Sequence, residues 1–251
     1  MVPKVFVHGN PETTAVWDPL IPELAKRGVD DCVLLSPPGF GAPVPAGFRG
    51  TRLDHRDWLI GELERLGEPV DLVGHDWGAG HTYAVAAARP DLLRSWAADC
   101  AGLLHPEYEW HRAAAVWQTA GAGEASIAQL VSVDAAALVA SARVPEALAP
   151  TMAEHLDARM GQAILRVYRS AVQPAMRELG EALASAERRP GLIVDATADA
   201  YVPSAMVHDV AAAVGADILT LEGMGHWWMW EGPALAADGL VAFWSKTGKR
   251  F

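Results

Sequence analysis

Short runs of apolar and β-branched residues alternate with longer stretches of helical periodicity along most of the chain. The apolar runs are typical of strands buried on both faces, and they occupy six ranges: Lys4–His8, Asp31–Leu35, Val70–Gly74, Arg94–Cys100, Leu192–Ala196 and Asp217–Leu221. The helical stretches separate most of these runs: Val16–Arg27, Leu53–Leu66, Thr82–Ala88, Ala205–Val214 and Ala234–Trp244. This alternation predicts an α/β fold, with a mostly parallel sheet of about six strands and helices on both of its faces.

The alternation is interrupted once, between Leu104 and Arg189. This region is rich in alanine and has helical periodicity, and its prolines and glycines divide it into several helices with no convincing strand. An all-helical insertion between two strands is expected to cover the carboxyl edge of the sheet, where open α/β sheets bind their ligands. We therefore predict a core made of residues 1–103 and 190–251, and a helical cap of residues 104–189.

Composition and charge indicate which classes of partner the protein can bind, but say little about the reaction it could catalyse. The 251 residues are 51% hydrophobic and carry a net charge of −11, an ordinary balance for a single globular unit. The negative charge repels nucleic acid and anionic membranes, and no apolar segment is long enough to span a bilayer. The N-terminus enters a strand without a signal peptide, and both cysteines lie in apparent buried strands. These features predict a cytoplasmic protein with reduced thiols. The sequence does not determine the oligomeric state, and a monomer or a homodimer is expected.

The segment VDLVGHDWGAG, at residues 70–80, places Asp76 at a sharp turn from a strand into a helix. Glycines let the strand bend tightly and let the next helix approach closely, which is the pattern of a nucleophile elbow. Most such elbows present serine. A carboxylate there is already ionised at neutral pH, needs no base to activate it, and can displace a leaving group from a saturated carbon. Asp76 is therefore predicted to be a nucleophile.

Two further residues complete a catalytic set in a suitable order. Asp199 follows the fifth predicted strand, and His226 follows the sixth in a loop bracketed by glycines. The order nucleophile, acid, histidine is the one expected for this kind of elbow. Asp199 would orient the imidazole of His226 so that its other nitrogen takes a proton from water. Asp99, near the end of the fourth predicted strand, is the alternative acid. Backbone N–H groups of the turn after the first strand and of Trp77 would form an oxyanion hole.

Several short motifs together resemble the α/β-hydrolase superfamily. They are HGNPE at residues 8–12, PPGFG at 37–41, GHDWG at 74–78, the loop of Asp199, and GHWW at 225–228. The aspartate in the elbow resembles the epoxide hydrolase and haloalkane dehalogenase branch. The resemblance covers the whole core, whereas the cap matches only locally. The chain departs from the family by starting at the HG-bearing strand, without the usual preceding antiparallel strands, so a minimal sheet of six strands is expected.

The two enzymes of this branch both form an alkyl ester on the aspartate, but they bind the leaving group differently. For an epoxide hydrolase, the resemblance of the cap segment AILRVYRSA makes Tyr168 the group that hydrogen-bonds the leaving oxygen. Tyr108 is then the possible second cap tyrosine. For a haloalkane dehalogenase, the resemblance makes Asn10 and Trp77 the pair that binds the departing halide, and the sequence HGNP resembles the dehalogenase form.

Glu12 and the Tyr168–Arg169 pair resemble the epoxide hydrolase branch, so opening of an epoxide to a vicinal diol is the favoured prediction. Haloalkane dehalogenation is the alternative, followed by esterase or lyase chemistry and by a ligand-binding protein without catalysis. The resemblance implies a small apolar electrophilic substrate and water as the second reactant, with no cofactor. The nine histidines show no metal-ligand spacing, so no metal is expected.

Overall fold

The computed structural model describes residues 2–247. Within these residues, six strands form one sheet, in which every neighbouring pair is parallel. The strands are β1 (Lys4–Val7), β2 (Cys32–Leu35), β3 (Val70–Gly74), β4 (Leu93–Ala98), β5 (Gly191–Ala196) and β6 (Asp217–Leu221). The predicted six-stranded α/β-hydrolase fold is confirmed, and the sheet is wholly rather than mostly parallel.

The strand order, β2-β1-β3-β4-β5-β6, reverses direction between β1 and β3. Lys4 of β1 is in register with Cys32 of β2 on one side and with Asp71 of β3 on the other. The chain therefore leaves β1 toward one side of the sheet and leaves β3 toward the other. Such a reversal opens a crevice beyond the carboxyl ends of the strands, and it places the loops after β1 and β3 at that crevice.

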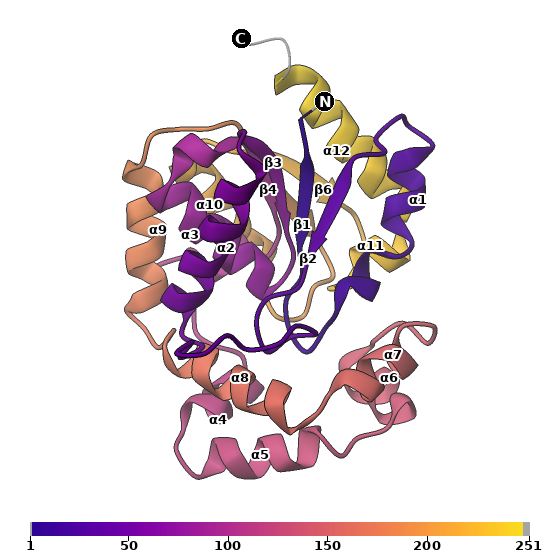
Figure 1. Ribbon diagram of the computed structural model, residues 1–251, viewed down its shortest axis with the longest axis vertical. Coiled ribbons are helices and arrows are strands. Elements are labelled where there is room, and N and C mark those ends of the chain that lie inside the picture. Colours follow the sequence, from indigo (N-terminus) through magenta and orange to yellow (C-terminus); the bar gives the residue numbers. More distant parts are fainter. Residues whose placement is uncertain (1, 248–251) are drawn as a thin grey trace.

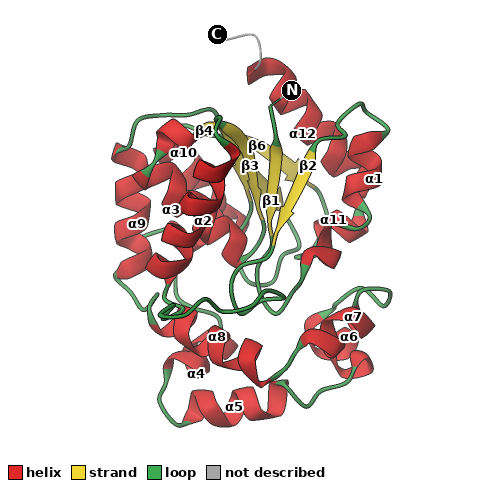
Figure 2. Cartoon of the chain, viewed as in Figure 1, coloured by secondary structure: helices red, strands yellow, loops and turns green. Residues whose placement is uncertain are grey.

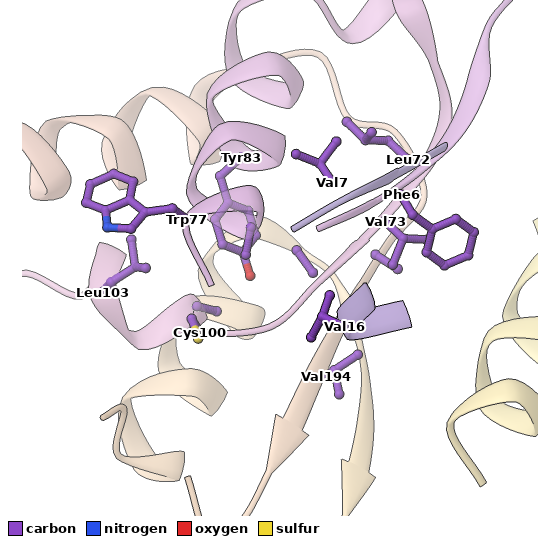
Figure 3. Packing of buried hydrophobic residues seen from close by; sticks show 14 of the residues in the cluster. Phe6, Val7, Val16, Leu72, Val73, Trp77, Tyr83, Cys100, Leu103 and Val194 are labelled. Carbon is purple, nitrogen blue, oxygen red and sulfur yellow. The ribbon is translucent and has the colours of Figure 1, made fainter. Parts of the chain in front are cut away.

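Helices cover both faces of the sheet (Figures 1 and 2). The two helices α1 (Leu20–Ala25) and α12 (Pro233–Thr247) pack together on one face. The other face carries α2 (Arg52–Leu66), α3 (Trp77–Ala88) and α10 (Ser204–Val214). Apolar side chains of the strands fill the space between the layers, and Figure 3 shows Val7, Leu72 and Val73 among them. Among residues 2–247, no helix has the length and apolar character needed to cross a membrane.

Six helices lie between β4 and β5: α4 (Arg112–Gln118), α5 (Ala122–Leu130), α6 (Ala135–Ala142), α7 (Ala149–His155), α8 (Ala158–Arg169) and α9 (Ala175–Ser185). Helices α4, α5 and α8 pack against one another, and α6 packs on α7. Figure 1 shows these five helices beyond the carboxyl edge of the sheet, whereas α9 runs along α3. The region from Leu104 to Arg189 is thus helical as expected, while the division into core and cap stays a prediction.

Two predicted elements differ from the structure for identifiable reasons. The single helix expected at Val16–Arg27 is wrong: a 3-10 turn at Thr14–Trp17 precedes α1. Pro19 stands at this break, because proline lacks the N–H that a continuous helix would use. The helix expected from Thr82 instead begins at Trp77, directly after the nucleophile position.

The cysteines also differ from expectation. Strand β4 ends at Ala98, so Cys100 lies outside the sheet, where it precedes a 3-10 turn at Ala101–Leu104. Its backbone has a φ of 51°, in the left-handed region. Cys32 lies in β2 as predicted but is only half-buried. Both thiols are free.

Candidate active site

Asp76 lies at the sharp turn between β3 and α3, with φ 52° and ψ −121°. A non-glycine residue in such backbone geometry costs about 1–3 kcal/mol and persists only where its surroundings enforce it. The neighbouring glycines make the turn possible. A Cβ atom on Gly78 would collide with the carbonyl oxygen of Val7, and one on Gly74 would collide with the backbone of Gly78. The close approach of α3 to β1 therefore fixes the position of Asp76.

The two carboxylate oxygens of Asp76 have different surroundings. Oδ1 accepts hydrogen bonds from the backbone N–H of Asn10 at 2.9 Å and from its side-chain Nδ2 at 3.2 Å. The loop after β1 fits closely here, since a Cβ atom on Gly9 would collide with Oδ1 of Asp76. Oδ2 faces His226, whose Nε2 lies 3.8 Å away. Oδ1 is thus bound by the loop after β1, whereas Oδ2 faces His226 without a direct hydrogen bond.

The structure brings His226 and Asp199 together at the same edge of the sheet. Nδ1 of His226 lies 2.9 Å from Oδ2 of Asp199, and Oδ1 of Asp199 accepts a hydrogen bond from the backbone N–H of Tyr201 at 2.8 Å. Burial lowers the pKa of His226, but the negative charge of Asp199 and its hydrogen bond outweigh burial, so the pKa is raised above its ordinary value. The hydrogen bond to Asp199 makes the imidazole of His226 a stronger base and directs Nε2 toward Asp76.

Asp99, the alternative acid, has other partners. Its Oδ1 accepts a hydrogen bond from the backbone N–H of Asp76 at 2.9 Å. Its Oδ2 contacts Nδ1 of His75 and accepts a hydrogen bond from the indole of Trp228 at 2.7 Å. Asp199 is therefore the carboxylate bonded to His226, while Asp99 lies beneath the elbow.

Two fully buried residues beside Asp76 were not identified from the sequence as site residues. Glu12 was expected to matter only for the family resemblance, and His75 was expected to have no role in the site. Oε1 of Glu12 lies 3.1 Å from Nε2 of His75, and Oε2 accepts a hydrogen bond from the backbone N–H of Gly9 at 3.0 Å. Their positions in the sequence could have indicated a role. Glu12 lies at the end of the turn after the first strand, where the oxyanion hole was expected, and His75 directly precedes Asp76.

The charges around Asp76 perturb its ionisation. Burial raises its pKa to about 6, and the charge of Glu12 adds to the rise. His226, His75 and the hydrogen bond from Asn10 lower the pKa and so limit the shift. A nucleophilic carboxylate in this site is therefore more basic than an ordinary aspartate, yet still ionised at neutral pH.

A cavity of about 240 Å³ opens over Asp76 and His226. Its walls are largely aromatic: Trp77, Tyr108, Trp110, His111, Trp117, Tyr168, Tyr201 and Trp227. The remaining lining is mostly aliphatic and comes in part from α5 and α6, with Leu130 and Leu138 as examples. Ligand pockets commonly measure about 300–1,000 Å³, so this cavity suits a small, largely apolar molecule.

Tyr168 projects from α8 into this cavity as its predicted role requires. Its ring meets that of Trp77 edge to face, with centroids 5.2 Å apart. Burial and the charge of Asp76 raise the pKa of the Tyr168 phenol, and polar contacts with the side chains of Asn10 and Trp77 oppose the rise. The phenol therefore stays protonated and lies near both proposed halide-binding side chains.

Tyr108, the possible second cap tyrosine, also lines the cavity. Its hydroxyl donates a hydrogen bond to the backbone carbonyl of Tyr201 at 3.2 Å. That bond ties Tyr108 to the loop that carries Asp199. Burial raises the pKa of the Tyr108 phenol well above its usual range, so this group is a hydrogen-bond donor at any ordinary pH.

Two sets of side chains have the atom types and spacing of metal ligands. They are Glu12, His75 and His226, and Cys100, Asp199 and His226, with ligand atoms within 4.8 Å of one another in each set. In both sets, a histidine nitrogen already faces a carboxylate. These atoms can serve proton transfer and charge pairing without an ion.

The sequence and the fold were compared with known proteins. Residues 5–238 match the model of the Alpha/beta hydrolase family. The chain belongs to this family. A solved structure of similar fold is that of the haloalkane dehalogenase DbeA from Bradyrhizobium elkani, with a TM-score of 0.75 and 22% identity over 98% of this chain and 91% of that one.

Curated relatives of this α/β hydrolase match over shorter segments. A haloalkane dehalogenase from Bradyrhizobium diazoefficiens is 31% identical over 94 residues, which cover 37% of this chain and 30% of that protein. An epoxide hydrolase from Caballeronia sordidicola is 35% identical over 95 residues, which cover 36% of this chain and 28% of that protein. The matches thus span less than a third of either relative, and both chemistries of the branch are represented.

Proposed function

We propose that this α/β hydrolase opens a small epoxide to a vicinal diol through a covalent ester on Asp76. The observation that carries the proposal is that the two oxygens of the Asp76 carboxylate have different partners. Oδ1 of Asp76 is bound by Asn10, while Oδ2 faces both the cavity and His226. An ionised carboxylate with one free oxygen at the base of an apolar cavity suits displacement at a saturated carbon.

In the first step, Oδ2 of Asp76 attacks an epoxide carbon. A carbon–oxygen ester bond forms as the ring carbon–oxygen bond breaks, and the electron pair of that bond stays on the ring oxygen. The phenol of Tyr168 donates its proton to this oxygen. Burial keeps the phenol protonated beforehand, and its contacts with Asn10 and Trp77 would steady the phenolate formed, which later regains a proton from water.

In the second step, His226 takes a proton from water, and the resulting hydroxide attacks the ester carbonyl carbon of Asp76. Negative charge then develops on Oδ1, the oxygen that already accepts the backbone N–H of Asn10; the N–H of Trp77 is the proposed second donor. Collapse of this intermediate breaks the bond between the carbonyl carbon and the substrate oxygen, and the imidazolium of His226 gives its proton to that oxygen, which releases the diol. The proton of the added hydroxyl passes through water to the phenolate of Tyr168, which restores the carboxylate of Asp76. Asp199 stabilises the imidazolium that forms on His226.

The position of the attacking water is suggested by two buried atoms. Oε1 of Glu12 and Nε2 of His75 lie 3.1 Å apart, but this contact is not well directed and neither atom has another hydrogen-bond partner among residues 2–247. An oxygen of Glu12 and a ring nitrogen of His75 lie within 4.8 Å of a ring nitrogen of His226. Buried polar atoms of this kind are commonly satisfied by an ordered water. We place the hydrolytic water between Glu12 and His226.

The helical region of residues 104–189 would then act as the cap of the site. It contributes Tyr108, Trp110, Trp117 and Tyr168 to the cavity wall. These rings exclude bulk water from the first step and select for small apolar substrates. Residues 1–103 and 190–251 would form the core that carries Asp76 and the other members of the triad.

Haloalkane dehalogenation is the second candidate, and one observation favours it. The side chains of Asn10 and Trp77 both line the cavity beside Asp76, so an amide and an indole are available to bind a departing halide. The same ester on Asp76 would form, and His226 would hydrolyse it in the same way. The two candidates differ only in the first leaving group.

Separate assays of the two products distinguish these candidates. The purified enzyme is incubated with a panel of styrene-type epoxides and with short haloalkanes, and diol and halide are measured independently. We expect diol from at least one epoxide at a rate that Asp76→Asn abolishes. Halide release without diol formation would replace the first proposal with the second.

A further inference from the structure

Two aspartates near Asp76 have different partners: Asp99 contacts the elbow and His75, whereas Asp199 contacts His226. We infer that Asp99 and a permanently protonated His75 position Asp76 for attack, whereas Asp199 alone serves His226. The inference rests on the proposed ester on Asp76 for its kinetic consequences. Its charge and geometry can be tested without any substrate.

Asp99 is held by contacts with the elbow and with the loop that follows His226. Its two oxygens accept from three donors on two segments: the backbone N–H of Asp76 and the ring of His75 in the elbow, and the indole of Trp228. The carboxylate is 3% exposed, so water cannot substitute for these contacts. Asp99 therefore binds the amide of the residue whose backbone, with φ 52°, is strained.

The surroundings of His75 require a proton on both of its ring nitrogens. A neutral imidazole has one donor nitrogen and one acceptor nitrogen, and an acceptor nitrogen would repel a carboxylate. Both nitrogens of His75 face carboxylates, Nδ1 toward Asp99 and Nε2 toward Oε1 of Glu12 at 3.1 Å. The ring is therefore an imidazolium between two carboxylates.

The charges around this ring agree with that state. Burial lowers the pKa of His75, but Asp99 and Glu12 raise it well above the ordinary value. The other ionisable groups that face the ring are Asp76, His8 and His226, and the rings of His75 and His226 are 4.6 Å apart. The carboxylates outweigh the repulsion from the two histidines.

Glu12, His75 and Asp99 form a network of contacts that extends to the loops on both sides of Asp76. At one end, Glu12 binds the backbone N–H of Gly9, in the loop that presents Asn10. At the other end, Asp99 binds the elbow and Trp228, which opens a short helix two residues after His226. One buried network thus connects the three loops that carry Asn10, Asp76 and His226.

The consequence concerns the first chemical step. Displacement at a saturated carbon needs Oδ2 of Asp76 in line with the bond that breaks, and a misplacement of about 1 Å can cost about 100-fold in rate. In Asp99→Asn, the new amide nitrogen is a donor that would face a donor on His75, Trp228 or Asp76. The elbow would lose at least one of its contacts, so formation of the ester would slow while hydrolysis of the ester would not.

The kinetic test compares Asp99→Asn with Asp199→Asn, a chemically identical change in the other aspartate. Single-turnover reactions are quenched at intervals, and the ester on Asp76 is measured by mass spectrometry. We expect Asp99→Asn to slow ester formation by about 10-fold or more without accumulation of ester. Asp199→Asn should accumulate ester because its hydrolysis is slowed. Accumulation in Asp99→Asn to the same extent would overturn the inference.

The second test needs neither turnover nor a folded variant. Nitrogen-15 labelling of histidine in the unmodified protein allows NMR to count the protons on each ring. We expect both nitrogens of His75 to be protonated at pH 7.5, and His81, which lacks such partners, to be neutral. A neutral His75 would refute the inference. Absence of ester in every variant, with His75 doubly protonated, would refute the proposed function instead.

Discussion

Nε2 of His226 lies 3.8 Å from Oδ2 of Asp76, too far for a direct hydrogen bond. A serine nucleophile must pass its proton to histidine, and so it must be hydrogen-bonded to it. An ionised aspartate has no proton to pass. The separation therefore fits a mechanism in which the histidine does not activate the nucleophile but acts later, on water.

Replacement of the histidine should separate the two chemical steps. In His226→Gln, Asp76 can still attack, but no base remains to activate water, so the ester should accumulate to about one per protein molecule. Intact-protein mass spectrometry after mixing with an epoxide measures the added mass. Asp76→Asn is the matched control and should gain none. A protein of unchanged mass in His226→Gln, with a substrate that the unmodified enzyme consumes, would argue against a covalent route.

The pKa of Asp76 should limit activity at low pH and cost stability at neutral pH. Only the ionised carboxylate attacks, so we expect kcat/KM to fall as the pH drops through about 6. Because the folded-state pKa of about 6 lies above the ordinary aspartate value of 3.8, this group's favourable contribution to stability is complete below 3.8 and is lost as the pH rises through 6.

Asp76→Asn removes that cost of ionisation and should stabilise the protein at pH 7.5, by on the order of 1–3 kcal/mol. Urea unfolding measures the gain, which should shrink as the pH is lowered below 6. Equal stability of the two proteins at pH 7.5 would mean that Asp76 is not perturbed by its surroundings.

Tyr168 should matter for epoxides and not for halides. Removal of its hydroxyl in Tyr168→Phe takes away a general acid, which typically contributes about 100-fold or more. We expect kcat for diol formation to fall by that order, with accumulation of ester reduced in a Tyr168→Phe/His226→Gln double variant.

Tyr108→Phe is the comparison, since the hydroxyl of Tyr108 donates to the carbonyl of Tyr201. This change should affect ester hydrolysis more than ester formation. Equal diol formation with and without the Tyr168 hydroxyl would exclude it as the acid.

The turn at the nucleophile should tolerate no side chain at Gly78. In Gly78→Ala, the new methyl group would meet the carbonyl oxygen of Val7, and we expect a loss of about 1–3 kcal/mol or more of unfolding free energy. Gly61→Ala is a suitable control in α2, because a Cβ atom there has no neighbour within 4 Å. It should be stabilising by about 0.5–1 kcal/mol. Similar melting temperatures for the two variants would show that the approach of α3 to β1 is not close.

The sheet and the proximity of Asp76, Asp199 and His226 could be predicted because they follow from local patterns and one geometric rule. Buried apolar runs located the strands, and parallel strands end at a common edge. Residues directly after β3, β5 and β6 therefore had to meet, as Asp76, Asp199 and His226 do. Pro19 also signalled the break before α1, a signal that the apolar periodicity of Val16–Arg27 concealed.

The buried network of Glu12, His75 and Asp99 could not be predicted in this way. Strands β4 and β5 are neighbours, so both Asp99 and Asp199 end near His226, and only the directions of their side chains decide which one binds it. The shape of the cavity could not be predicted either. Its shape depends on how α4, α5 and α8 pack, and a periodic helix pattern states which face is buried but not against what.

Oxygen labelling tests the central claim most directly. One turnover is run in water enriched in oxygen-18 with enzyme in excess over an epoxide, and label is measured in the diol and in the peptide that contains Asp76. If the ester forms and water attacks its carbonyl carbon, oxygen-18 enters Asp76 and the first diol molecules carry none from the solvent. Label in the diol and none in Asp76 would show direct attack of water on the substrate and would contradict a covalent Asp76 intermediate.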